Sequence, residues 1–170
     1  MLQVLVLRHA IAEDRAEAAR AGIPDPRRAL TDKGIRRMRE VAAGLATVMA
    51  SPRRIRHSPL RRARETAEIL AAAFPSAALE ESAALTPGMD PAGLDDVLRV
   101  PDSSPVVLVG HEPDLGLWLA RALQGEPARP LPLKKAGSAL VTFPGAIGPG
   151  EAELEWLLPP RLARRLGGLG

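Results

Sequence analysis

Two of the three histidines in this chain, His9 and His111, come one residue after its two most apolar short runs. Arg8 precedes His9, so a guanidinium and an imidazole stand side by side. Arginine presents a planar fork of N–H donors that fits an oxyanion. Histidine is largely neutral at pH 7, so it can act as a nucleophile or as a hydrogen-bond partner. The combination indicates phosphate chemistry; the alternative is a strand that simply ends in two polar residues.

The runs before the two histidines, residues 3–7 and 105–109, are short, uncharged and rich in Val and Leu. Such runs predict buried strands of a parallel sheet. The carboxyl ends of parallel strands meet at one edge of the sheet, and ligands bind at that edge in open α/β folds. We therefore expect His9 and His111 to lie close together there.

A third candidate segment begins with Ser58 and Pro59, a pair typical of a helix start, with serine as the N-cap and proline at the first helical position. Arg61 and Arg62 then fall in the first turn. A helix N-terminus attracts anions through its free N–H groups and its dipole, so arginines at this place suit a bound phosphate. His57 is expected at the mouth of the same pocket, with a structural or a substrate-contact role.

Hydrophobic periodicity predicts the remaining elements. The predicted helices are 32–50, with Thr31 as its N-cap, 60–73, 94–98 and a helix after His111 whose buried face is Leu115, Trp118, Leu119, Ala122 and Leu123. The further strands are 53–57, 79–80, 139–143 and 151–158. In the last strand Ala152, Leu154, Trp156 and Leu158 alternate with Glu151, Glu153, Glu155 and Leu157, which predicts one buried and one exposed face. Strands that alternate with helices indicate an α/β fold. We expect a three-layer sandwich: a mostly parallel central sheet, helices on both faces, and an antiparallel edge formed by the last two strands. Residues 1–158 would form a single domain and residues 159–170 a loosely held tail.

Composition limits the classes of function. The chain has 170 residues, 46% hydrophobic and 2% aromatic, which suffices for one core built mainly from aliphatic side chains. The net charge of +3 is too small, and aromatic residues are too few, to indicate nucleic-acid binding. The absence of cysteine excludes disulfides and thiolate metal sites. No apolar run approaches the roughly 18 residues of a membrane span, so we expect a soluble, cytoplasmic protein with neither a membrane nor nucleic acid as its partner.

Three motifs, in order, resemble those of a known family. Leu7-Arg8-His9-Ala10 resembles the Arg-His-Gly signature of the histidine phosphatase superfamily, whose fold is phosphoglycerate mutase-like, with alanine in place of the usual glycine. Residues 58–67, Ser-Pro-Leu-Arg-Arg-Ala-Arg-Glu-Thr-Ala, are similar to its second motif, Ser-Pro-Leu-x-Arg-Ala-x-x-Thr-Ala. Residues 110–113, Gly-His-Glu-Pro, are similar to its third, which carries a second catalytic histidine.

Within the superfamily the chain most resembles the SixA-type phosphohistidine phosphatases. The likeness includes the small size, residues 25–34 (Asp-Pro-Arg-Arg-Ala-Leu-Thr-Asp-Lys-Gly), residues 85–88 (Leu-Thr-Pro-Gly) and the Trp-Leu pair at 156–157. It implies that His9 is a nucleophile that becomes transiently phosphorylated, with His111 as the second catalytic histidine. No metal and no cofactor are implied. The expected substrate-binding residues are the two phosphate-binding arginines of the motifs and their neighbours: Arg8, Arg62, Ser58, Arg61 and His57.

The general acid is the one part of the family pattern that cannot be aligned. Larger relatives carry a glutamate that protonates a leaving alkoxide, and four carboxylates are candidates here: Glu80, Glu81, Asp90 and Glu112. Phosphohistidine has an imidazole leaving group, which is far less basic than an alkoxide once its other nitrogen is protonated. A strong acid then matters less, so its absence favours a phosphoramidate substrate.

The leading hypothesis is a metal-independent phosphatase that removes phosphate from phosphohistidine in a signalling protein of a phosphorelay. One alternative is a phosphomonoesterase of the same fold that acts on a small phosphorylated metabolite. A second alternative is a non-catalytic module that binds phosphate or docks an acidic protein through its arginines.

Overall fold

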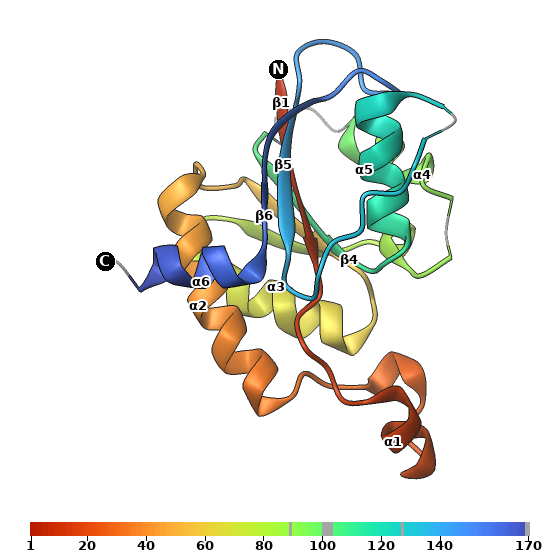
Figure 1. Ribbon diagram of the computed structural model, residues 1–170, viewed down its shortest axis with the longest axis vertical. Helices are drawn as coiled ribbons and strands as arrows, with labels where there is room; N and C mark the ends of the chain where they lie inside the picture. The colour runs from red at the N-terminus through yellow and green to blue at the C-terminus, as the bar shows by residue number, and fades with distance from the viewer. Residues whose placement is uncertain (89, 100–103, 127, 169–170) are drawn as a thin grey trace.

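The computed structural model describes residues 1–88, 90–99, 104–126 and 128–168 (Figure 1). Its strands and helices alternate along most of the chain, as the hydrophobic pattern predicts. In chain order the elements are β1 (Leu2–Arg8), α1 (Arg15–Arg20), the 3-10 turn η1 (Asp25–Arg27), α2 (Asp32–Val48), β2 (Arg54–His57), α3 (Arg61–Ala73), β3 (Ala78–Glu81), the 3-10 turn η2 (Ala83–Leu85), α4 (Gly93–Leu98), β4 (Val106–Gly110), α5 (Asp114–Gln124), β5 (Ser138–Phe143), β6 (Glu153–Leu158) and α6 (Pro160–Gly167).

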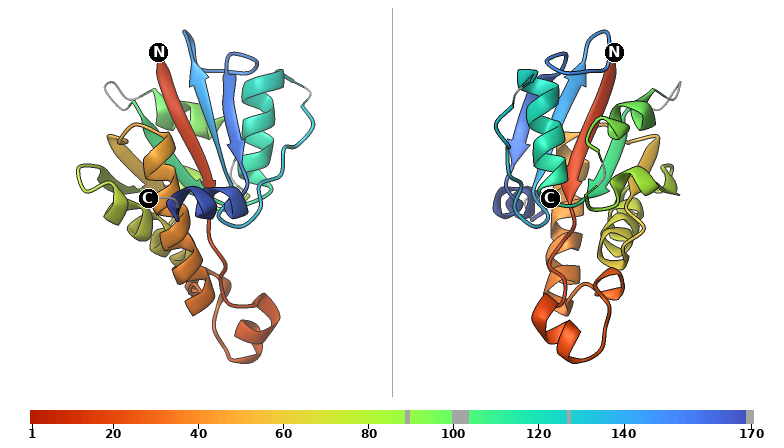
Figure 2. Two further views of the ribbon diagram at one scale, coloured as in Figure 1. Left: turned by 60° about the vertical axis from the view of Figure 1, so that its left-hand side comes forward. Right: turned by 90° about the vertical axis from the view of Figure 1, so that its right-hand side faces the viewer.

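One six-stranded sheet, ordered β3-β2-β4-β1-β5-β6, forms the centre of the molecule (Figure 2). Strands β3, β2, β4 and β1 run parallel. Strand β5 pairs antiparallel with β1, and β6 pairs antiparallel with β5. The predicted parallel sheet with an antiparallel edge is therefore confirmed, and β1 and β4, the strands that precede the two candidate histidines, are direct neighbours.

Helices cover both faces of the sheet, which confirms the three-layer arrangement (Figure 1). Strand β1 supplies both layers of the core because its side chains alternate: Leu5 and Leu7 pack with α2, α3 and α6, while Val4 and Val6 pack with α4 and α5. All four side chains are fully buried. A strand buried on both faces can place polar residues only near its ends, as β1 does with Arg8, its last residue, and with His9 just beyond it.

The start of α3 differs from the prediction. Leu60, rather than Ser58, is the residue that caps the helix, and it does so without a side-chain hydrogen bond. The hydroxyl of Ser58 instead accepts the N–H of Leu60, 3.2 Å away, within a tight turn that precedes the helix. The Ser-Pro pair still ends β2 and starts a helix, but the serine side chain is free for another partner.

Strand β6 departs from its predicted pattern because it contains a bulge. The register moves from Leu140 opposite Trp156 to Val141 opposite Leu154, so Glu155 has no opposite residue. The bulge breaks the expected alternation. Leu154, expected on the buried face, is 47% exposed, whereas Trp156 packs against the core on the α2 side.

The prediction of a loose tail from residue 159 is wrong for the part of the tail that is described. Residues Pro160–Gly167 form α6, which lies across α2 (Figure 1). Ala163 is fully buried, and a Cβ atom on Gly44 would lie only 1.9 Å from its carbonyl oxygen. A Cβ atom on Gly167 would lie 2.5 Å from the carbonyl oxygen of Glu40. The two glycines thus let the helix backbones touch. Residues 169 and 170 lie outside the described part.

The close contact predicts a stability effect at Gly44. Alanine normally favours a helix over glycine by up to about 1 kcal/mol. At Gly44 we expect Gly→Ala to lower the free energy of unfolding by about 1–3 kcal/mol, because the new methyl group must push α6 away. Urea unfolding measures the change. Gly93→Ala in α4 is the matched control and should be neutral or stabilising, because an added Cβ atom would meet nothing within 4 Å among the described residues outside its own helical turn. Equal stability of Gly44→Ala and wild type would contradict this account of how α6 is held.

No helix in the described part of the chain is long and apolar enough to cross a membrane.

Candidate active site

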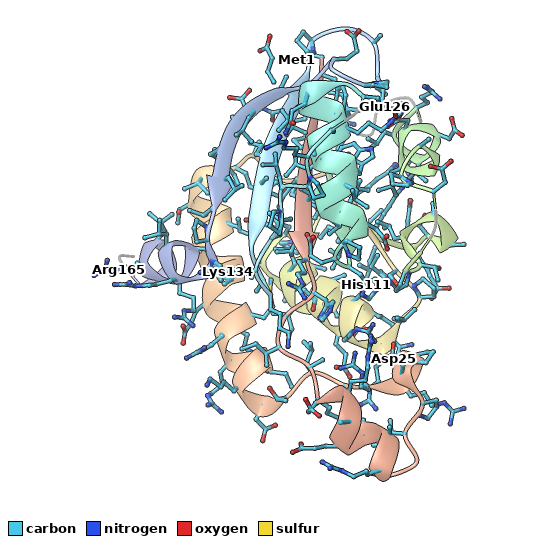
Figure 3. The ribbon with its side chains drawn as sticks, turned by 45° about the vertical axis from the view of Figure 1, so that its right-hand side comes forward. Met1, Asp25, His111, Glu126, Lys134 and Arg165 are labelled. Carbon is cyan, nitrogen blue, oxygen red and sulfur yellow. The ribbon has the colours of Figure 1, made fainter. Side chains whose placement is uncertain are left out.

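The carboxyl ends of three neighbouring strands bring the motif residues together. Arg8, the last residue of β1, is in register with Gly110, the last residue of β4, and the N–H of His9 donates to the carbonyl of Gly110 at 3.0 Å. The N–H of Ser58, just past β2, donates to the carbonyl of Val109. The rings of His9 and His111 consequently lie 5.1 Å apart between centroids. Figure 3 shows His111 at this end of the sheet, with Asp25 nearby on the segment that follows β1.

His9 is held as a neutral imidazole with one defined tautomer. Its Nδ1 lies 2.7 Å from the carbonyl oxygen of Ala10, and since a carbonyl can only accept, Nδ1 carries the proton and Nε2 keeps its lone pair. Burial, with further contributions from the charges of Arg62 and Arg8, lowers the pKa of His9 to about 3. The free lone pair makes Nε2 a nitrogen that can attack an electrophile at neutral pH.

The backbone beyond His9 is fixed by the buried hydroxyl of Thr66. The N–H of Ala10 donates to Thr66 Oγ1 at 3.0 Å, and the same hydroxyl donates to the carbonyl of Arg62 at 2.7 Å. This pair of bonds ties the loop after β1 to the first turns of α3. It sets the position of His9 relative to Arg62.

Arg8 and Arg62 are both held in place by hydrogen bonds from their terminal nitrogens to backbone carbonyls. Arg8 Nη1 donates to the carbonyl of Leu133 at 2.8 Å. Arg62 donates from Nη1 to the carbonyl of Asp25 at 2.9 Å and from Nη2 to its carboxylate at 3.2 Å. In both side chains the buried Nε–H has no partner within the described structure. Buried donors are almost always paired, so these two N–H groups are available to a bound group.

His111 supplies a third such atom. Its Nε2 lies 2.8 Å from Ser58 Oγ, while its buried Nδ1 has no partner among the described residues. Burial is the main cause that lowers the pKa of His111 to about 3, followed by the neighbouring His9 and Arg62. The second histidine is therefore also neutral at pH 7.

These residues line one cavity of about 260 Å³. The predicted members Arg8, His9, Arg62 and His111 all border it. Three further cations, Arg15, Arg28 and Lys135, border it too, together with the carboxylates of Glu13, Asp14 and Glu112. A concave site with an excess of positive charge and unpaired N–H donors fits a tetrahedral oxyanion. Among the described residues no group of three or more His, Cys, Asp or Glu side chains is arranged to hold a metal ion.

Three predicted substrate-binding residues do not border the cavity. Ser58 is fully buried and reaches it only through its contact with His111. His57 is buried as well, and its Nδ1 donates to the carbonyl of Ser58. Arg61 points to solvent and pairs with Glu65 at 2.7 Å, because it lies on the outer side of α3. The motif places these residues near the site in sequence, but the direction of each side chain is set by strand and helix geometry.

Of the four candidate acids, Glu112 alone borders the cavity. Glu80 forms ion pairs with Arg54 and Arg56 on the adjacent strand. Glu81 is exposed at the end of β3, and Asp90 accepts the N–H of Ala92 in a turn.

Glu112 is tied to the loop that anchors Arg8. Its Oε1 accepts the N–H of Leu133 at 3.1 Å. Burial raises the pKa of Glu112, although hydrogen bonds from the amides of Leu133 and Gly116 act in the opposite direction. This carboxylate holds the Leu133 loop in place.

Asp25 is a functional candidate that sequence reasoning missed. Its carboxylate bonds Arg62, Arg28 and Arg15 at distances of 3.0–3.2 Å. Burial alone raises the pKa of Asp25, but the three arginines outweigh it and the pKa is held below its ordinary value. Asp25 holds both terminal nitrogens of Arg62, so Nε is the nitrogen of this guanidinium that has no partner among the described residues. Its only sequence signal is its place in the 25–34 segment.

The two neutral histidines predict a pH dependence of stability. The folded state keeps His9 and His111 neutral down to a pKa of about 3, whereas in the unfolded chain each takes up a proton below its ordinary pKa of 6.5. This stability is fully present above pH 6.5 and is lost as the pH falls toward 3. The lowered pKa of Asp25 acts in the same direction at lower pH.

Between pH 7.5 and pH 5 we expect the free energy of unfolding to fall by roughly 2–4 kcal/mol. Urea unfolding at several pH values measures this, with a His9→Asn, His111→Asn double variant as the control. In the double variant the free energy of unfolding should lose most of its dependence on pH. A wild type that is equally stable at both ends of this range would show that the histidines titrate normally.

Comparisons of the sequence with known proteins identify a family and a relative. The histidine phosphatase superfamily (branch 1) matches residues 4–86. An uncharacterised protein from Picosynechococcus sp. is 41% identical over 140 residues, which cover 80% of this chain and 82% of that protein.

Solved structures extend the likeness to nearly the whole chain. The protein histidine phosphatase SixA, solved with tungstate, has a TM-score of 0.78 and 24% identity and covers 94% of this chain and 97% of its own. A phosphoserine phosphatase from Entamoeba histolytica, solved with 3-phosphoglyceric acid, has a TM-score of 0.64 and 18% identity. The match covers 93% of this chain and 97% of that phosphatase. At these identities the likeness shows a shared fold.

Proposed function

Since this chain belongs to the histidine phosphatase superfamily, we propose that it is a phosphatase that works through a transient phosphohistidine on His9 and acts on phosphohistidine in a partner protein. One observation carries the proposal. Arg8, Arg62 and His111 border the same cavity as His9, and each has a buried nitrogen without a partner among the described residues: Arg8 Nε, Arg62 Nε and His111 Nδ1. The His9 proton lies on Nδ1, which leaves the lone pair on Nε2. Such a set suits a nucleophile facing a phosphoryl group whose oxygens take up the N–H groups.

The reaction proceeds in two displacements. His9 Nε2 donates its lone pair to phosphorus in line with the leaving nitrogen, and the bond from phosphorus to that nitrogen breaks. Arg8, Arg62 and His111 hold the equatorial oxygens as charge builds on them. Water then attacks the phosphorus on His9, the P–N bond breaks, and inorganic phosphate leaves with His9 restored.

The state of Glu112 supports a phosphoramidate substrate. Its carboxylate accepts the backbone N–H of Leu133 at 3.1 Å, so it serves as a structural acceptor. An imidazole leaving group that is already protonated on its other nitrogen needs no strong acid, unlike an alkoxide. The structural relative named as a protein histidine phosphatase was solved with tungstate, a tetrahedral oxyanion like phosphate.

A phosphomonoesterase is the second candidate, and Glu112 is again the observation that favours it. The carboxyl borders the cavity and its pKa is raised by burial, which are properties of a general acid. A phosphoserine phosphatase shares the fold. In this account Glu112 would protonate a leaving alkoxide.

A paired rate assay separates the two candidates. Wild type and Glu112→Gln receive a phosphohistidine-bearing protein and, separately, a panel of phosphate monoesters, with a chelator present throughout. The phosphatase proposed here should release phosphate faster from phosphohistidine, and Glu112→Gln should change that rate less than tenfold, since an amide oxygen can still accept an N–H. Faster monoester hydrolysis, reduced by Glu112→Gln about 10²-fold or more, would favour the second candidate.

A further inference from the structure

We propose that Ser58 is a positioning residue that sets the tautomer of His111. The Ser58 hydroxyl donates its hydrogen to His111 Nε2, which leaves the imidazole proton on Nδ1, the nitrogen that is buried and unpaired beside the cavity. His111 then serves as a neutral N–H donor to a phosphoryl oxygen. That His111 donates to a phosphoryl oxygen rests on the function proposed above, whereas the tautomer of His111 does not.

The backbone fixes Ser58 beside His111. The N–H of Ser58 donates to the carbonyl of Val109 at 3.0 Å, which attaches the end of β2 to the strand that leads into His111. Ser58 is fully buried, so water does not compete for its hydroxyl. Its oxygen lies 2.8 Å from His111 Nε2.

The hydrogen bonds of Ser58 determine which way the proton points. The hydroxyl oxygen already accepts the N–H of Leu60 at 3.2 Å. A hydroxyl has one hydrogen to donate, and among the described residues the acceptor that contacts it is His111 Nε2. The opposite arrangement, with Nε2–H donating to Ser58, would leave a buried hydroxyl hydrogen without an acceptor.

The surroundings of the other nitrogen favour the same tautomer. His111 borders the cavity together with Arg8 and Arg62, the residues that would hold an oxyanion, and its Nδ1 has no partner among the described residues. A bare lone pair on Nδ1 would repel that oxyanion, whereas an N–H attracts it. Double protonation is disfavoured, because burial, His9 and the two arginines lower the pKa of His111 more than Asp25 raises it.

The role of Ser58 differs from the one that its sequence position predicts. The Ser-Pro pair predicts a helix N-cap, yet the Ser58 hydroxyl does not cap α3. The hydroxyl instead bonds Nε2 of His111, and the partner of one imidazole nitrogen determines whether the other nitrogen carries the proton.

Imidazole nitrogen NMR tests the tautomer directly, because the chain has only three histidines. His9 and His57 each donate from Nδ1 to a backbone carbonyl. We therefore expect all three imidazoles of the wild type to carry their proton on Nδ1 at neutral pH. In Ser58→Ala only His111 should shift toward Nε2–H. Wild-type His111 protonated on Nε2 would overturn the proposal, whatever becomes of the variant.

Tungstate binding tests the consequence without a requirement for turnover. Ser58→Ala should bind tungstate about 10- to 100-fold more weakly, since the donor at Nδ1 is lost in much of the population. Ser58→Thr, which keeps the hydroxyl, should restore both the affinity and the tautomer. Ser138→Ala is the matched control, because Ser138 is fully buried in β5 and its unpaired hydroxyl does not border the cavity.

The outcomes separate this inference from the proposed function. A wild type that has the predicted tautomer and binds tungstate more tightly than Ser58→Ala, but has no phosphatase activity, would contradict the proposed function alone. Unchanged tungstate binding in a folded Ser58→Ala protein would overturn the positioning role.

Discussion

Replacing His9 by asparagine should reduce turnover on the order of 10⁴-fold or more, because it removes the atom that attacks phosphorus. Asparagine is the informative choice. Its side-chain N–H₂ can still donate to the carbonyl of Ala10, as Nδ1 of the histidine does, so the loop after β1 should keep its place. What the variant lacks is a nitrogen lone pair at the position of Nε2. Steady-state rates with the better of the two substrate classes measure the loss.

Binding separates a lost nucleophile from a damaged site. Arg8, Arg62 and His111 remain in His9→Asn, so tungstate affinity should stay within about tenfold of wild type. His57→Asn is the matched control: His57 is also buried and also donates from Nδ1 to a backbone carbonyl, but it does not border the cavity. A similar loss of turnover in both variants would point to misfolding, and an active His9→Asn would contradict the covalent mechanism.

The parts of the site that follow strands could be predicted from the sequence. The runs before His9 and His111 are apolar on both faces, and in an alternating α/β chain such runs can only be central strands. Their carboxyl ends must then lie at one edge, so two histidines about 100 residues apart in sequence can be placed side by side. Arg62 followed from its position at the start of a helix at that same edge.

The side chains that orient these groups could not be predicted in this way. Asp25 lies in the connection between β1 and α2, where no hydrophobic period fixes the position of the backbone. The carbonyl that anchors Arg8 belongs to Leu133, in another long connection. The local sequence predicts that Ser58 caps a helix, but its hydroxyl bonds His111, which lies far away in the sequence.

The same limit applies to the fold. The bulge in β6 inverts an alternation that is regular in the sequence. Helix α6 depends on small residues, Gly44 and Gly167, which carry no hydrophobic signal.

Replacing Arg62 by lysine should lower kcat/KM about 10²- to 10³-fold, although the positive charge is kept. Arg62 uses its two terminal nitrogens on Asp25 and has Nε left for a phosphoryl oxygen. A lysine ammonium on a flexible chain cannot serve both places with a fixed geometry. If charge alone were needed, Arg62→Lys would stay within about tenfold of wild type, and the fork geometry would be irrelevant.

Asp25→Asn shows whether catalysis needs the carboxylate that holds Arg62 as well as Arg62 itself. The amide oxygen of asparagine can still accept from Arg62, but the charge that holds Arg62, Arg28 and Arg15 together is gone. We expect kcat/KM to fall about tenfold, less than in Arg62→Lys, because Nε of Arg62 can still reach the phosphoryl group.

Arg61→Lys is the control on the neighbouring position, which faces solvent and pairs with Glu65. A loss in Arg61→Lys as large as that in Arg62→Lys would mean that both arginines bind substrate, as their shared place in the first helical turn suggests, and that the outward direction of Arg61 does not hold during the reaction.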